Sequence, residues 1–199
     1  RFDAGSRALY ATDGSNFRQP PIGVVIPTSI DDVVATHAVC HEHQAPILPR
    51  GCGTSLSGET VNHAVVIDFA KYLDGIGPVD AERRLVRTEP GAVNEKVNEA
   101  AAKHRLAFGP DPSTHAYCTI GGNIGNNSCG THSLQARLAG EGSRTSDNVR
   151  EMEVLTYDGL RLRVGPTSDA ELEECISAGG RQEAFFLRFL PPPEEFASD

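Results

Sequence analysis

The chain has 199 residues, and 18 Lys and Arg against 27 Asp and Glu give it a formal net charge of −9 at pH 7. This length predicts one domain, or two small ones that share a core. A hydrophobic share of 39% and a charged share of 23% are ordinary for globular proteins and exclude a disordered chain. The acidic balance excludes a typical nucleic-acid-binding surface, and no apolar stretch reaches the ~20 residues of a membrane span.

The cysteines argue for a reducing compartment. Five are scattered along the chain without C-x-x-C spacing: Cys40, Cys52, Cys118, Cys129 and Cys175. This pattern predicts reduced thiols and encodes neither a zinc site nor an iron–sulfur cluster. The chain begins at Arg1 without a signal-like apolar stretch, so we expect a piece of a longer cytoplasmic protein. Peripheral attachment of the longer protein to a membrane stays open.

Strand and helix patterns alternate in the first third of the chain. Residues 23–26 predict a strand, and the periodic apolar residues of 30–38 predict a helix capped by Thr28. Apolar runs at 47–48 and 64–68 predict two further strands. This order indicates parallel strands joined by a right-handed crossover.

The pattern changes near Gly77. Beyond it we expect a strand at 83–89, a helix at 93–104 and a β-hairpin at 149–164 around an Asp-Gly turn. Ser168, followed by several acidic residues, predicts the start of another helix. The expected divisions are a first subdomain at 1–77, a second at 78–190 and a solvated tail at 191–199.

A glycine-rich loop at 49–58 follows the second predicted strand directly. Gly51 and Gly53 permit positive φ, so successive N–H groups can point at one phosphate, and three hydroxyl side chains add donors. The G-x-G-x-x-G pattern of a Rossmann turn and the Gly-Lys-Ser/Thr of a P-loop are both absent. By itself, the loop fits a phosphate site or a tight turn facing solvent.

A second loop, at 109–130, is rich in glycine and asparagine. Thr119 is expected to cap a short helix whose first N–H groups are free to meet an anion. Gly121 and Gly122 lack a Cβ and let a planar ligand approach the backbone, while the asparagines offer amide donors and acceptors. An ordinary polar surface loop is the alternative. Together the two loops suit a diphosphate flanked by flat rings.

Three motifs in order, at 49–58, 111–130 and 145–159, resemble the FAD-binding domain of the vanillyl-alcohol oxidase / p-cresol methylhydroxylase superfamily. Within it, the chain is most similar to the D-2-hydroxyacid dehydrogenases, the group of the glycolate oxidase subunit and the D-lactate and D-2-hydroxyglutarate dehydrogenases. The resemblance runs from about Leu9 to Gly180. It implies an α+β fold of the p-cresol methylhydroxylase type, with a small parallel β-α-β subdomain and a larger mixed or antiparallel sheet with helices.

The resemblance also implies where FAD binds, with its diphosphate at the first loop and its flavin at the second. The implied cofactor-binding residues are Arg50, Gly51, Cys52, Gly53, Thr54, Ser55, Gly58, Pro112, Ser113, Thr119, Gly121, Gly122, Asn123 and Asn126. Some members of the superfamily tether the flavin through a histidine in the first loop. Residues 51–55 contain none, so we expect non-covalent FAD.

The implied activity is oxidation of a D-2-hydroxyacid by hydride transfer to the flavin. In the resembling enzymes the substrate is held by a further domain, so we expect no catalytic residue and no efficient turnover within these 199 residues. Two alternatives stay open. One is another flavoenzyme of the superfamily, such as a UDP-sugar enolpyruvyl reductase. The other is a non-catalytic binding module with the same fold.

The remaining candidates favour ordinary roles. His37 and His41 are spaced like a metal-binding pair but lack a nearby third ligand. His115 and His132 flank the second loop, where polar loop contacts are the favoured interpretation. The segment 135–143 is longer than is usual in the resembling family and predicts a mobile surface loop.

Overall fold

The computed structural model describes residues 1–138 and 142–181, which belong to two compact units, Arg1–Val149 and Arg150–Asp199. The first unit contains α1 (Ala4–Leu9), β1 (Gly23–Val25), α2 (Ile30–Glu42), β2 (Ile47–Arg50), β3 (Val65–Asp68), α3 (Asn94–Ala102), α4 (Ile120–Gly125), the 3₁₀-helix η1 (Thr131–Ser133), α5 (Leu134–Leu138) and α6 (Thr145–Asn148). The second contains β4 (Met152–Leu155), β5 (Arg161–Val164) and α7 (Asp169–Ser177). The predicted tail at 191–199 lies outside the described residues. The predicted subdomain boundary near residue 77 stays a prediction.

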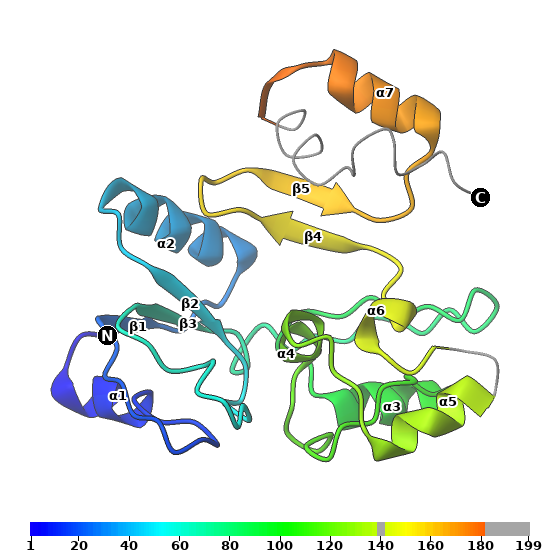
Figure 1. The fold of residues 1–199 in the computed structure, drawn as a ribbon, viewed down its shortest axis with the longest axis horizontal. Helices are drawn as coiled ribbons and strands as arrows, with labels where there is room; N and C mark the ends of the chain where they lie inside the picture. The colour runs from blue at the N-terminus through cyan, green and yellow to red at the C-terminus, as the bar shows by residue number, and fades with distance from the viewer. Residues whose placement is uncertain (139–141, 182–199) are drawn as a thin grey trace. The chain divides into compact units, whose positions relative to one another are not determined.

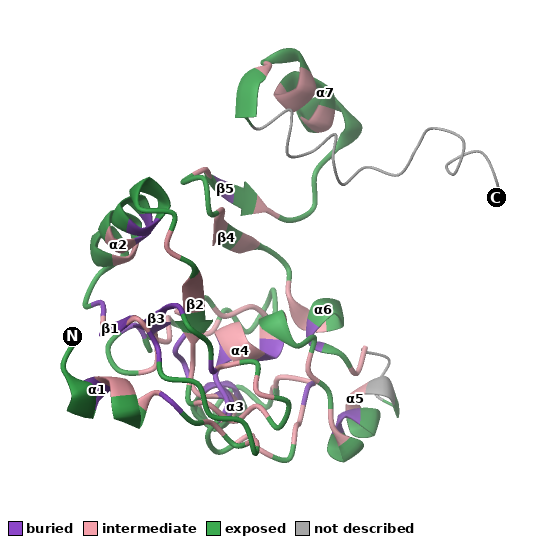
Figure 2. Cartoon of the chain, turned by 60° about the vertical axis from the view of Figure 1, so that its left-hand side comes forward, coloured by how far each residue is buried: buried purple, intermediate pink, exposed green. Residues whose placement is uncertain are grey.

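A parallel three-stranded sheet in the order β1-β3-β2 organises the start of the first unit. The register places Val66 of the central strand opposite Val24 on one side and Leu48 on the other. All four residues of β3 are buried, as expected for a parallel strand covered on both faces. Figures 1 and 2 place α1 and α2 on opposite sides of this sheet. The predicted parallel pairing is therefore confirmed.

The cap of α2 differs by one residue from the prediction. Ser29, not Thr28, is the N-cap: its Oγ accepts from the N–H of Asp32 at 3.2 Å, and the Asp32 carboxylate accepts from the N–H of Ser29 at 3.0 Å. The Thr28 hydroxyl donates to the same carboxylate at 2.8 Å from outside the helix. Both residues can cap, and the carboxylate three positions after Ser29 completes a capping box there.

A second core forms where α3 and α4 meet. Ala92, Val97 and Ile120 are buried against one another, and Figure 2 shows buried residues along both helices. The strand expected at 83–89 is wrong, because its residues form only isolated bridges to 76–80. Arg84 has a positive φ of 55°, and this turn interrupts the extended run that a strand requires.

The segment expected to be a loop begins as a helix. Leu134–Leu138 forms α5 directly after η1, so the expectation of a loop is wrong for residues 135–138. Leucine and alanine in this helix favour helix formation, whereas the loop was expected from the glycines further along the segment. Residues 139–141 of the same segment lie outside the described residues.

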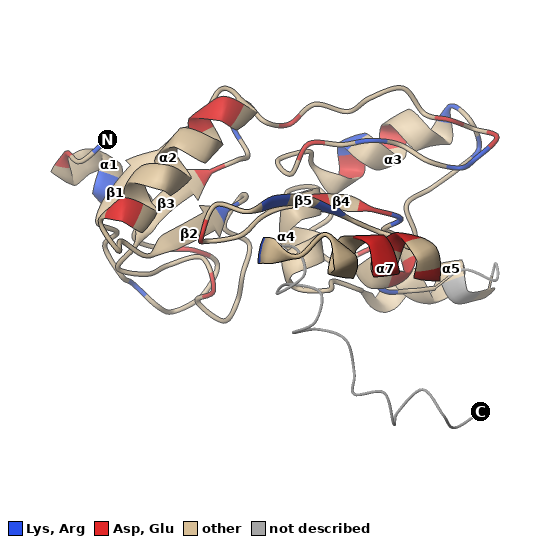
Figure 3. Cartoon of the chain, turned by 90° about the horizontal axis from the view of Figure 1, so that it is seen from above, with Lys and Arg blue, Asp and Glu red and all other residues tan. Residues whose placement is uncertain are grey.

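The second unit, taken by itself, contains a hairpin and a helix. β4 and β5 pair antiparallel, and Gly159 in the connecting turn has a φ of +81°. Arg161 of β5 forms an ion pair with Glu153 of β4, Arg163 forms one with Glu151 just before β4, and α7 carries a run of acidic residues (Figure 3). Ser168 caps α7 in a capping box with Glu171. The predicted hairpin, helix start and α+β class are confirmed.

Candidate functional site

A cavity of about 260 Å³ lies within the first unit, where the first glycine-rich loop faces α4 and the residues just before it. Its walls are mostly backbone, hydroxyl and amide groups. The lining residues are Gly51, Cys52, Gly53, Thr54, Ser55, Leu56, Ser57, Glu59, Thr60, Thr114, Cys118, Thr119, Gly122, Asn123, Asn126 and Ser128. The structure therefore brings the two loops together around one hollow.

The first loop presents unpaired backbone donors to this cavity. β2 ends at Arg50, and the next five N–H groups, those of 51–55, reach no acceptor in the described part of the chain. Gly53 has a φ of +69°, which turns successive N–H groups toward a common point. A Cβ on Gly51 would lie 2.3 Å from the Oγ1 of Thr119, so only glycine lets the two loops approach this closely. The result is a concave set of donors suited to an anion.

Arg50 holds the base of this loop and does not line the cavity. Its guanidinium donates to the carbonyl oxygens of Thr12 at 2.9 Å, Thr60 at 3.0 Å and Tyr10 at 3.3 Å, and lies 5.3 Å from the Tyr10 ring centroid. Burial lowers the pKa of this guanidinium, and neighbouring carboxylates, among them Asp13, oppose that effect. Arg50 thus ties the loop to residues near the N-terminus, and backbone N–H groups remain as the donors that face the cavity.

The second loop uses its backbone differently. Thr119 caps α4 as predicted, with its Oγ1 accepting from the N–H of Gly122 at 3.3 Å. The N–H groups of Ile120 and Gly121, however, donate to the carbonyl oxygens of Ala92 and Pro90, each at 2.8 Å. The expectation that these first N–H groups are free to meet an anion is therefore wrong. The neighbouring chain segment supplies the acceptors that the sequence of the loop does not reveal.

Gly121 and Gly122 also differ in what they face. A Cβ on Gly121 would press against Pro90 at 3.0 Å, so this glycine serves packing within the chain. A Cβ on Gly122 would approach only the Thr119 hydroxyl, at 3.3 Å, and Gly122 lines the cavity. Of this glycine pair, Gly122 is the one whose missing side chain leaves room for a ligand.

Asn123 supplies a buried donor. Its side chain is 1% exposed, it lines the cavity, and its Nδ2 has no hydrogen-bond partner among the described residues. The thiol of Cys118, a weak acceptor, lies close by. An unpaired buried amide costs about 1–3 kcal/mol, so this arrangement favours a ligand that accepts from it. Asn126 differs, since its Nδ2 already donates one hydrogen bond to the carbonyl oxygen of Gly122 at 3.1 Å.

Two thiols face the cavity without being activated. Desolvation raises the pKa of both Cys52 and Cys118 above its ordinary value. The nearby polar side chains of Thr114, Asn123 and Asn94 oppose this effect at Cys118 without reversing it. Both groups are therefore protonated near neutral pH and serve as small wall residues, because a nucleophilic cysteine requires a lowered pKa.

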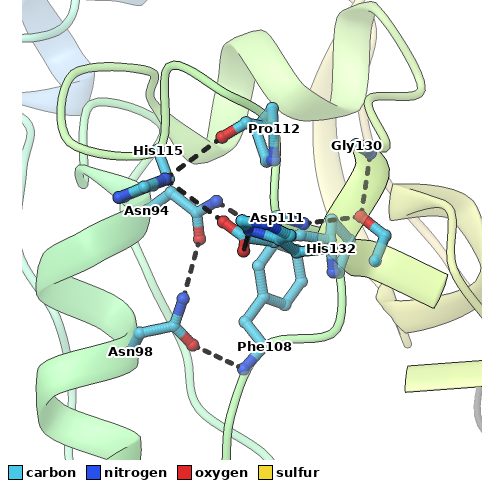
Figure 4. A network of polar contacts seen from close by, with 10 residues as sticks. Asn94, Asn98, Phe108, Asp111, Pro112, His115, Gly130 and His132 are labelled. Carbon is cyan, nitrogen blue, oxygen red and sulfur yellow. Dashed lines mark hydrogen bonds and ion pairs between the residues drawn. The ribbon is translucent and has the colours of Figure 1, made fainter. Parts of the chain in front are cut away.

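A polar network joins the two ends of the second loop to each other (Figure 4). The Ser133 hydroxyl accepts from the N–H groups of Asp111 at 2.7 Å and Gly130 at 2.8 Å. The Asp111 carboxylate contacts the Nδ1 atoms of His115 at 3.2 Å and His132 at 3.1 Å. The two histidines therefore make the loop contacts that the sequence favoured.

The predicted site residues fall into two groups. Those that line the cavity are Gly51, Cys52, Gly53, Thr54, Ser55, Thr119, Gly122, Asn123 and Asn126. Those outside its lining are Arg50, Gly58, Pro112, Ser113 and Gly121. Lining residues that the sequence interpretation did not include are Leu56, Ser57, Glu59, Thr60, Thr114, Cys118 and Ser128. Leu56 and Ser57 already lie in the predicted loop 49–58, and Glu59 and Thr60 follow it directly.

No helix in the described ranges combines the length and the apolar composition that crossing a bilayer requires.

Residues 21–165 match a family described as FAD binding domain. The match covers most of the chain, which therefore belongs to the family of FAD-binding domains, and FAD is its cofactor. The resemblance drawn from the three motifs is confirmed.

Individual relatives agree with this family. The chain is 32% identical over 182 residues to a D-2-hydroxyglutarate dehydrogenase of Pseudomonas putida, covering 90% of the chain and 18% of that protein. It is 38% identical over 166 residues to the glycolate oxidase subunit GlcD of Escherichia coli, covering 81% of the chain and 31% of that protein. It thus spans less than a third of either relative. A solved structure of an alkyldihydroxyacetonephosphate synthase shares the fold, with a TM-score of 0.67 and 19% identity over 81% of the chain and 31% of the other protein.

Proposed function

We propose that this chain is the FAD-binding part of an oxidoreductase that oxidises a D-2-hydroxyacid, and that the first loop holds the diphosphate of FAD. The N–H groups of 51–55 would take the diphosphate oxygens. Asn123 would donate to an acceptor of the same ligand, and Gly122 would give it room.

One observation carries this proposal: five successive N–H groups and a buried amide, all without partners among the described residues, belong to one cavity. Neither Lys nor Arg is among the lining residues. Backbone dipoles, which such concave N–H arrangements supply, and the Asn123 amide would therefore hold an anion there. A diphosphate diester, with one charge on each phosphate, suits this arrangement.

The names of the relatives support the substrate class. They are a dehydrogenase of D-2-hydroxyglutarate and a glycolate oxidase subunit, and both act on 2-hydroxyacids. Bound FAD would supply the acceptor for the hydride, which carries both electrons. The residues of this chain would hold and orient that cofactor. Because the chain spans 18% and 31% of those proteins, oxidation of the hydroxyacid is proposed for the whole protein.

FAD titration of two glycine variants tests the role of the first loop. Gly53 and Gly58 both have positive φ, at 69° and 77°, so alanine strains the backbone at either position. Only Gly53 lines the cavity. We expect Gly53→Ala to weaken FAD binding at least about 30-fold, measured by quenching of flavin fluorescence, and Gly58→Ala to have a much smaller effect at similar loss of stability. Equal FAD affinities of Gly53→Ala and the wild type would refute the assignment of the diphosphate to this loop.

A second experiment tests how FAD is attached. Because no histidine lies in 51–55, we propose that the cofactor is held without a covalent bond. Acid precipitation of the FAD-loaded protein should leave all the flavin in the supernatant. Flavin that stays with the precipitated protein would contradict this proposal.

A further inference from the structure

Glu59 is the one carboxylate among the residues that line the cavity, and neither Lys nor Arg accompanies it. It follows the donor loop by a few residues, so it shares one small hollow with the N–H groups of 51–55. A carboxylate beside a site for an anion weakens that site by repulsion. Glu59 is exposed, and a ligand group that donates hydrogen bonds and carries no negative charge suits its carboxylate better than a phosphate does.

Local hydrogen bonds hold Glu59 in place. The Oγ of Ser55 accepts from the N–H groups of Ser57 and Glu59, both at 3.2 Å, and donates to the Oε2 of Glu59 at 3.0 Å. The Ser55 hydroxyl is thereby committed to the carboxylate and is not a donor for phosphate. The Oε1 of Glu59 accepts from no group among the described residues. The next residue, Thr60, is anchored through its hydroxyl to Asp13 at 2.9 Å, so the loop presents Glu59 from a fixed backbone.

The ligand of this cavity offers suitable donors. In FAD the diphosphate joins a ribose to a ribityl chain, and both carry hydroxyl groups next to the phosphates. A carboxylate accepts strongly from such hydroxyls, and the hydrogen bond is charge-assisted. Resting on the proposed function, we infer that Glu59 accepts a hydrogen bond from a sugar hydroxyl adjoining the diphosphate and makes the site selective for ligands with an unmodified sugar. A phosphate on that hydroxyl would face the carboxylate and be rejected.

Paired ligands separate this role from simple repulsion. For the ribose, we would compare ADP with 2′,3′-dideoxy-ADP as competitors of FAD. For the ribityl chain, we would compare riboflavin with lumiflavin, which lacks that chain. Each comparison is made with the wild type, Glu59→Ala and Glu59→Gln. The ADP analogues share one diphosphate and the two flavins carry none, so repulsion of phosphate cancels within each pair.

In one of the two pairs, the ratio of the affinity for the hydroxyl-bearing ligand to that for its counterpart should be about tenfold larger in the wild type than in Glu59→Ala. The pair that responds identifies the ribose or the ribityl chain as the source of the hydroxyl. Glu59→Gln keeps the size of the side chain and should lose part of this preference. Glu99→Ala, which removes an exposed glutamate of α3, is the matched control and should leave both preferences unchanged.

Two results would overturn the inference. One is a wild-type preference that Glu59→Ala leaves unchanged in both pairs, and the other is the absence of any such preference in the wild type. In either case Glu59 only positions Ser55. A wild type that fails to bind FAD would instead overturn the proposed function, and this inference with it, so the two failures are distinguishable.

Discussion

The two glycine-rich loops look alike in sequence, yet the structure uses their backbones in opposite ways. The N–H groups of 51–55 reach no acceptor among the described residues, whereas those of Ile120 and Gly121 donate to the carbonyl oxygens of Ala92 and Pro90. The first loop therefore offers backbone donors to the cavity. The second offers the Asn123 side chain and the space beside Gly122.

The way each loop is held follows the same division. Side chains hold the base of the first loop, where Arg50 donates to three carbonyl groups and Tyr10 donates to Asp68 at 2.5 Å. The second loop is held mainly through its own backbone, which donates to neighbouring carbonyls and to the Ser133 hydroxyl. A loop that is fixed by side chains keeps its N–H groups for a ligand. Glycine content alone does not distinguish the two cases.

The largest effect is expected from a substitution that disrupts the backbone packing of the second loop. A Cβ on Gly130 would lie 1.9 Å from the carbonyl oxygen of Asp111, and backbone cannot yield as a flexible side chain does. Gly130→Ala should lower the free energy of unfolding by about 3 kcal/mol in urea denaturation. Gly125→Ala, whose Cβ meets nothing within 4 Å, should leave it unchanged or raise it. Equal urea midpoints of the two variants would argue against close backbone packing at Gly130.

The next prediction concerns the space for the ligand in α4. Gly122→Val would place a branched side chain in the cavity, and we expect FAD affinity to fall about 100-fold with the fold retained. Gly125→Val makes the same change in the same helix at a position that does not line the cavity, and should bind FAD nearly as the wild type does. Fluorescence titration measures both, and circular dichroism checks the fold. Equal affinities of the two variants would mean that Gly122 does not face the ligand.

Replacing the buried Asn123 amide should change stability and FAD binding in opposite directions. Asn123→Leu removes the unpaired Nδ2, so without FAD we expect the protein to be more stable by about 1 kcal/mol. The same change should weaken FAD binding about tenfold, because a donor to the ligand is lost. Urea denaturation and FAD titration of one variant measure both effects. Lower stability together with unchanged affinity would assign Asn123 to the fold alone.

The smallest effect is expected at the base of the first loop. Burial and the hydrogen bond to Asp68 raise the pKa of Tyr10 from its ordinary value of 10.0 to about 12. Above pH 10 the unfolded chain ionises this phenol while the folded chain keeps it protonated. Its contribution to stability is thus present below pH 10 and lost as the pH rises toward 12. Between pH 8.5 and pH 11 the urea midpoint should fall further for the wild type than for Tyr10→Phe. Equal falls for the two proteins would contradict the raised pKa.

Much of the fold follows from local sequence patterns. The parallel strands, α3, the hairpin and the capping of α4 and α7 were predictable because short apolar runs, an Asp-Gly turn and Ser or Thr caps specify them within a few residues. The strand at 83–89 was not, because a positive φ at Arg84 breaks it. The cavity walls were largely predictable because glycine and hydroxyl residues cluster in two segments. The use of the N–H groups depends on carbonyls elsewhere in the chain, which motif spacing does not reveal.

Amide hydrogen exchange, with and without FAD, tests the division between the loops most directly. The N–H groups of 51–55 should exchange fast in the free protein and become protected when FAD binds, because their acceptors come with the ligand. Those of Ile120 and Gly121 should be protected in both states by the carbonyl oxygens of Pro90 and Ala92. Protection that FAD induces at Ile120 and Gly121 but not at 51–55 would contradict the account.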